Sequence, residues 1–240
     1  TYLYFEYIRA GDRISVKPHA SPVYHAIQFL LGNLVPEYLK QMRGFHGLQA
    51  YPSRTKDPDQ VDFSTGSVGL GAVAPNFASL TGEYTRSHGF HKDGGRGRYI
   101  SVVGDAELDE GSVWEAIAEP EMSDLSNILW VVDLNRQSLD RIIPGIRARA
   151  WREMFDANGW SVIDAKYGKH LLAAFNEPNG DLLRHTIDDM SNQVYQRLLR
   201  VSPGELREWL PRSSRYHDDL SRFLERWDDH QLQDLILFFP

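Results

Sequence analysis

Apolar residues along this chain follow two different periods. Four short runs have strand character, and they lie at residues 13–17, 99–103, 128–132 and 160–163. Between them apolar residues recur every three or four positions, at residues 21–31, after Gly69, at 113–118 and at 151–158. Continuous apolar runs are typical of buried parallel strands, whereas the wider spacing is typical of helices. The alternation predicts an α/β fold with a mostly parallel sheet and helices on both faces.

Other segments extend this prediction. Residues 44–63 are rich in Gly, Pro, Asp and Ser and predict a long irregular loop, which in compact domains is usually functional or mobile. The helix after Gly69 carries five apolar residues on one face, namely Leu70, Val73, Phe77, Leu80 and Tyr84. From Asp181 onward the pattern is helical and strongly charged. We expect an α/β domain over residues 1–200 and a helical extension over 201–240.

Composition narrows the classes of function. The chain has 240 residues, and 26 Lys and Arg against 33 Asp and Glu give a net charge of −7, which argues against nucleic-acid binding. The absence of cysteine excludes disulfides, thiolate catalysis and cysteine-ligated metal centres. No apolar run is long enough to span a membrane, and the start lacks the pattern of a signal peptide. A cytoplasmic location is therefore expected.

Oxygen-bearing side chains follow two of the predicted strands. Gly104 and Asp105 come directly after the run at 99–103, and Asn135 follows the run at 128–132. Carboxylate and amide oxygens suit Mg²⁺, and backbone N–H groups in such a turn suit an anion such as a diphosphate. Ligands of open α/β sheets bind at the carboxyl ends of strands. Each residue taken alone is also compatible with an ordinary turn or helix cap.

Two further segments fall in order along the chain. Residues 17–22 read Lys-Pro-His-Ala-Ser-Pro and end the first short strand, and residues 64–71 read Ser-Thr-Gly-Ser-Val-Gly-Leu-Gly before a helix. The glycines there permit a ligand to approach the backbone. Alone, His19 is equally consistent with a buried structural histidine, and the glycine run with a simple helix start.

Together the four segments resemble the thiamine-diphosphate enzymes of the transketolase superfamily. Within that superfamily, the residues of these segments are most similar to the decarboxylating first component of pyruvate dehydrogenase complexes in its homodimeric form. The matching stretches are residues 17–31, 51–71, 104–110, 131–139, 157–163 with Gly168, and weakly 193–210.

The resemblance implies roles for individual residues. Asp105 and Asn135 would bind Mg²⁺ through their side chains, and Gln137 would do so through its main-chain carbonyl. The cofactor would be contacted by residues of all four segments: His19, Ser21, Gly66, Val68, Gly104, Asp105, Ala106, Glu107 and Asn135. Within that set Ala106 and Glu107 would donate backbone N–H groups to the diphosphate. His19 would also be a catalytic residue near the substrate.

Three positions depart from the family pattern. Ala106 replaces the second glycine of Gly-Asp-Gly, Ser53 replaces the histidine of Tyr-Pro-His, and Pro18 replaces the glycine before His19. Ala106 is acceptable if its φ is negative. The change at Ser53 removes a usual cofactor-side histidine, for which His46 is a candidate substitute.

The family implies a thiamine-diphosphate- and Mg²⁺-dependent oxidative decarboxylation of a 2-oxoacid, pyruvate first, with acyl transfer to lipoyl. The implied partners are the 2-oxoacid, the lipoyl domain of an acyltransferase component, and a pyrimidine-binding domain from the same or a partner chain of a dimer. We expect this chain to hold only the diphosphate half of the site and to stop before the family's closing strand. Transketolase-like ketol transfer and a non-catalytic fragment or subunit are the alternatives.

Overall fold

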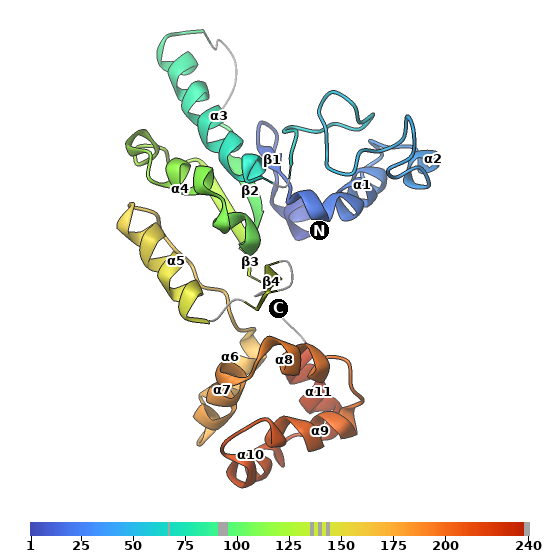
Figure 1. Cartoon of the computed structure of the whole chain (residues 1–240), viewed down its shortest axis with the longest axis vertical. Helices are drawn as coiled ribbons and strands as arrows, with labels where there is room; N and C mark the ends of the chain where they lie inside the picture. Colours follow the sequence, from blue (N-terminus) through green and yellow to red (C-terminus); the bar gives the residue numbers. More distant parts are fainter. Residues whose placement is uncertain (67, 91–95, 135–136, 139–140, 143–144, 238–240) are drawn as a thin grey trace. The chain divides into compact units, whose positions relative to one another are not determined.

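The computed structural model describes residues 1–240 apart from 67, 91–95, 135–136, 139–140, 143–144 and 238–240. The chain forms two compact units, Thr1–Ser161 and Val162–Pro240. Figure 1 shows the elements of each unit. The units are described separately below.

The first unit is built on a parallel sheet of three strands. The strands are β1 (Arg13–Ser15), β2 (Tyr99–Gly104) and β3 (Ile128–Asp133), in the order β1-β2-β3. Both pairings are parallel, and Gly104 lies opposite Asp133 at the end of the β2–β3 pair. The predicted α/β class and three of the four predicted strands are therefore confirmed.

The fourth predicted strand is wrong. Residues 160–163 form neither strand nor helix, and Ile163 is 91% exposed. Trp160 is one of the apolar residues of this run. It packs in an aromatic cluster with Trp130 and Phe155 and donates its indole N–H to the carbonyl of Ile117. The apolar character at Trp160 therefore reflects its place in a cluster of aromatic side chains and not a β-strand.

Helix α3 (Leu70–Ser87) packs on the sheet through its small residues. Gly71 lies against Ser15 of β1, and the carbonyl of Ala72 accepts a hydrogen bond from Ser101 of β2. Asn76, which is also buried, accepts a hydrogen bond from the indole of Trp130 in β3. Small side chains on both partners permit this close approach of helix and sheet.

The apolar face expected on α3 exists, but it points outward. Leu70, Phe77 and Tyr84 are 55%, 43% and 58% exposed. The spacing of these residues predicted the helix correctly, yet the face that meets the sheet is the opposite one.

The remaining elements of the first unit surround this sheet and helix. The longer ones are α1 (Ser21–Leu30), α4 (Gly111–Ile117) and α5 (Gly145–Ala157), which agree with the helices expected from the sequence. Short elements are η1 (Leu3–Tyr7), η2 (Pro18–Ala20), α2 (Pro36–Leu39), η3 (Asp105–Asp109), η4 (Pro120–Met122) and the antiparallel pair β4 (Gln137–Ser138) and β5 (Arg141–Ile142).

The second unit is a helical cluster. Its helices are α6 (Lys169–Phe175), α7 (Gly180–Asp189), α8 (Asn192–Leu198), α9 (Pro203–Arg212), α10 (His217–Leu224) and α11 (Asp229–Leu237). Their buried leucines, such as Leu183, Leu210 and Leu220, form one hydrophobic core. Because this core already recruits α6, the structure divides at residues 161 and 162, whereas the sequence pattern placed the division at 200 and 201. Within the described part of the chain, no helix has the length and apolar character needed to cross a membrane.

Candidate functional site

The carboxyl ends of the three strands meet at one edge of the sheet. Gly104 at the end of β2 lies in register with Asp133 at the end of β3. Lys17, which follows β1, donates a hydrogen bond from Nζ to Oδ2 of Asp133 over 3.0 Å. A methyl group added at Gly104 would lie 2.7 Å from Cε of Lys17. Because Gly104 has no side chain, the side chain of Lys17 can pass over it and reach Asp133.

Asp105 begins the 3₁₀ turn η3 and is 1% exposed. Its Oδ1 accepts a hydrogen bond from the backbone N–H of Ala106 over 3.0 Å. The turn is fixed further by the indole of Trp114, which donates to the carbonyl of Leu108. A buried carboxylate is thus held at the strand end where the sequence predicts a metal ligand.

Glu107 closes the turn from the other side. Its Oε2 accepts a hydrogen bond from the backbone N–H of Gly104 over 2.8 Å. Burial raises the pKa of the Glu107 carboxyl, while the hydrogen bond from Gly104 and the charge of Lys17 act in the opposite direction. Glu107 therefore shapes the turn with its side chain, a role that the sequence did not suggest.

The other two predicted metal ligands lie just past β3. Asn135 falls outside the described residues. Gln137 begins β4, and β4 packs against η3. The backbone of the Gln137 segment is therefore close to the turn of Asp105. Within the described ranges, no three acidic or histidine side chains gather as a metal cluster.

His19 lies in η2 and is exposed. Its ring meets that of Tyr51 edge to face, with centroids 5.8 Å apart. Ser21 donates a hydrogen bond to the carbonyl of Ala50 over 2.8 Å. These contacts join the segment after β1 to the loop that carries Tyr51 and Ser53.

The candidate substitute histidine is on the same loop. His46 is exposed, has a φ of 58° and packs against the ring of Phe45. Its proposed compensation for Ser53 stays a prediction. Ser53 itself is half-buried, and its backbone N–H donates to Asp57 over 2.7 Å.

The glycine-rich segment lies beside the end of β1. Thr65 and Ser15 both lie against Gly71, where an added Cβ would be 3.1 Å from Cγ2 of Thr65 and 3.0 Å from Oγ of Ser15. Both hydroxyl oxygens are buried and have no hydrogen-bond partner among the described residues. Of the two predicted contact positions, Gly66 is half-buried and Val68 is exposed. Ser15 and Lys17 thus contact Gly71 of the glycine-rich segment, Gly104 before the Asp105 turn and Asp133 at the end of β3.

Sequence reasoning missed two polar pairs. One is the ion pair of Lys17 and Asp133. The sequence offered a signal for it, because Lys17 ends one predicted strand and Asp133 directly follows another. The other is a buried pair in which Nδ1 of His25 and Oδ2 of Asp59 are 2.7 Å apart. This second pair joins α1 to the long loop, so the segment expected to be irregular is nevertheless fixed by buried contacts.

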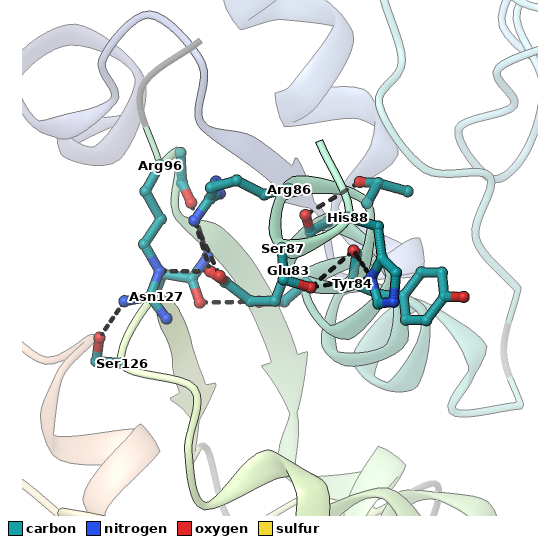
Figure 2. A network of polar contacts seen from close by, with 12 residues as sticks. Glu83, Tyr84, Arg86, Ser87, His88, Arg96, Ser126 and Asn127 are labelled. Atoms are coloured by element: carbon teal, nitrogen blue, oxygen red, sulfur yellow. Dashed lines mark hydrogen bonds and ion pairs between the residues drawn. The ribbon is translucent and has the colours of Figure 1, made fainter. Parts of the chain in front are cut away.

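A different polar network lies at the amino ends of the strands (Figure 2). Glu83 near the end of α3 forms ion pairs with Arg86 and Arg96, and Arg96 donates to Ser126 over 2.9 Å. Asn127 joins the same region by donating to the carbonyl of Gly97. Because ligands of such sheets bind at the carboxyl ends, this network has a structural role in holding α3 on the sheet.

Comparison with known families identifies one family that matches most of the chain. The family described as "Transketolase, thiamine diphosphate binding domain" matches residues 9–178. The chain belongs to this family. The match spans η2, the glycine-rich segment, η3 and the ends of all three parallel strands.

The chain is also similar to individual proteins with two kinds of name, pyruvate dehydrogenase E1 component and transketolase-like protein. The chain is 29% identical to the pyruvate dehydrogenase E1 component of Pseudomonas aeruginosa over 82% of this chain and 23% of that protein. It is 26% identical to the protein of the same name in Escherichia coli over 92% of this chain and 25% of that protein. Transketolase-like protein 2 of Mus musculus is 31% identical over 66% of this chain and 25% of that protein. The chain therefore spans about a quarter of the length of these relatives.

The residues present fit a metal-bound diphosphate. Asp105 offers a buried carboxylate, Lys17 offers a positive charge, and Ser15 and Thr65 carry buried hydroxyl groups without partners among the described residues. One carboxylate with few other protein ligands suits Mg²⁺, which keeps waters and phosphate oxygens in its coordination sphere.

Proposed function

We propose that this chain forms the diphosphate- and Mg²⁺-binding half of a thiamine-diphosphate enzyme that oxidatively decarboxylates a 2-oxoacid, with pyruvate as the first candidate. The observation that carries the proposal is the register of Gly104 with Asp133. It brings the buried Asp105 turn and the segment that leads to Asn135 to one edge of the sheet. The names of the bacterial relatives support the choice of reaction.

The residues of this chain would bind and orient the cofactor. Asp105, Asn135 and the carbonyl of Gln137 would hold Mg²⁺, and the backbone N–H groups of Ala106 and Glu107 would meet the diphosphate. The N–H of Ala106 now donates to Asp105, so this carboxylate has to change partner before that N–H is open to an anion. When bound, thiamine diphosphate supplies a nucleophilic carbon and an electron sink.

His19, Ser21, Gly66 and Val68 would line the other side of the cofactor. The exposed ring of His19 is held against Tyr51 and is accessible to a substrate, which suits a role in proton transfer. Transfer of the acyl unit to a lipoyl domain, a pyrimidine-binding domain from the same or a partner chain, a dimer and a cytoplasmic location are further parts of this proposal. The acyl transfer, the pyrimidine-binding domain and the dimer rest on the family resemblance, and the location rests on the expectation from the sequence pattern.

Removal of the Asp105 carboxylate tests the metal site. Asp105→Ala should abolish Mg²⁺-dependent binding of thiamine diphosphate, measured by calorimetry, because the buried oxygen ligand is lost. Asp105→Asn keeps the shape of the side chain and should weaken binding, which separates loss of the ligand from loss of folding. The matched control is Asp124→Ala, at an exposed position of the same unit. An affinity unchanged in Asp105→Ala would refute the assignment.

Activity of the full-length protein separates the three functions. With Mg²⁺ and thiamine diphosphate, pyruvate-dependent reduction of an artificial electron acceptor supports the proposed reaction. Turnover of sugar phosphates without turnover of pyruvate would instead favour ketol transfer, which the mouse relative makes the second candidate. If a pyrimidine-binding domain added in trans restores no turnover to this chain, the non-catalytic alternative is favoured.

A further inference from the structure

Lys17 lies where the three strand ends meet. Its ammonium group is 3.0 Å from Oδ2 of Asp133, and a Cβ at Gly104 would be 3.0 Å from the same Nζ. The side chain of Lys17 is only 19% exposed, whereas that of Asp133 is 58% exposed. The positive charge is therefore held beside Gly104, the residue that directly precedes Asp105 and its turn.

This edge of the sheet also holds several carboxylates. Asp105 and Glu107 are buried in the turn, and Asp133 ends the neighbouring strand. A diphosphate with one Mg²⁺ still carries net negative charge, so its binding beside these groups needs a compensating cation. Lysine serves as a compact point charge for phosphate and has three N–H donors. Among the described residues Lys17 uses one donor, toward Asp133, which leaves N–H groups for an anion.

We propose that Lys17 binds a phosphoryl oxygen of the cofactor diphosphate and that Asp133 holds its ammonium group in position. This inference rests on the proposed function and adds a residue that the family pattern did not assign. Gly104 has a part in the arrangement, because any side chain there would displace the end of Lys17. The alternative is that Lys17 only joins β1 to β3 through a partly exposed ion pair, and such pairs contribute little to stability.

Phosphate-bearing probes distinguish the two roles. We would titrate Mg²⁺-pyrophosphate and Mg²⁺-thiamine diphosphate into the chain by calorimetry, because pyrophosphate requires only the diphosphate half of the site. Lys17→Met, which keeps the aliphatic stem, should weaken both probes roughly tenfold to a hundredfold. Lys17→Arg should retain most of the affinity, since it restores the charge. Lys166→Met is the matched control, because Lys166 pairs with Asp188 in the other unit.

A variant at Gly104 provides an independent check. Gly104→Ala is compatible with its φ of −83° but should displace the end of Lys17 and weaken pyrophosphate binding. If Lys17 is the ligand, adding Gly104→Ala to Lys17→Met should produce little further loss. Full additivity of the two losses would count against the proposal.

The outcomes separate this inference from the proposed function. Binding by the native chain with equal binding by Lys17→Met would overturn the role of Lys17 and leave the proposed function standing. If Lys17→Met and Lys17→Arg lose affinity alike and both lower the unfolding midpoint, the role is structural and the inference fails. If the native chain binds neither probe, in this form and in the full-length protein, the proposed cofactor site fails together with the inference.

Discussion

Helix α3 in the first unit and helix α10 in the second use their apolar residues in opposite ways. In α10 the apolar residues Leu220, Phe223 and Leu224 are all buried in the helical core. In α3 the buried face consists of Gly71, Ala72 and other small or polar residues, and the large apolar side chains lie on the exposed face.

The difference follows from what each helix packs against. In α10 the partners are other helices, whose buried leucines share one hydrophobic core with its own apolar side chains. In α3 the partner is a sheet that presents Ser15 and Ser101, so a small helix face makes the closer contact. Hydrophobic spacing therefore locates both helices but identifies the buried face of only one.

A leucine-to-alanine substitution on each helix should give the largest difference in unfolding free energy. Leu220→Ala removes a side chain that is 0% exposed and should cost about 2–5 kcal/mol of unfolding free energy, because it leaves a cavity. Leu70→Ala, on the outer face of α3, should cost less than about 0.5 kcal/mol. Chemical denaturation of both variants measures the contrast. A large loss for Leu70→Ala would show that the outer face of α3 is covered in solution.

Enlarging the small face of α3 should give an intermediate effect. Gly71→Val would drive a branched side chain into Ser15 and Thr65 and should cost about 1–3 kcal/mol through overpacking. Thr81→Val is the control, because it places the same residue on an exposed position of the same helix. If thermal unfolding shows equal stability for the two variants, α3 is not closely packed on the sheet.

The smallest effect concerns buried charge. Because burial raises the pKa of Glu107, the native state binds a proton that the unfolded chain has lost only at pH values between the unfolded and the folded pKa, and stability falls as the pH rises through that window. Glu107→Gln still accepts the hydrogen bond from Gly104 but has no charge, so it should raise the unfolding midpoint slightly at pH 7 and have no such effect well below the ordinary glutamate pKa. The exposed Glu115→Gln is the control. A lower midpoint for Glu107→Gln at pH 7 would mean that its charge is net stabilising, for instance through Lys17.

Much of the first unit was predictable from local pattern. The strands β2 and β3 have continuous apolar runs, and β1 lies in a short β-prone run. The turn at Asp105 directly follows β2, so the sequence predicted the strand ends and the position of this candidate ligand. The run from Trp160 to Ile163 shows the limit of local pattern. Trp160 packs in an aromatic cluster, and Ile163 is exposed, yet the run has the same pattern as a buried strand. The contact of His25 with Asp59 joins two segments that are distant in the chain, and neither segment carries a local signal of it.

The sequence by itself determined the α/β class, the strand ends and the order of the four candidate segments, because each depends on the spacing of nearby residues. Only the tertiary structure decided which face of α3 is buried, where the second unit begins, and that Lys17 reaches across Gly104 to Asp133. These features depend on strand register and on side chains that are far apart in the chain. Local periodicity specifies an element, whereas its environment is set by the partners that folding brings to it.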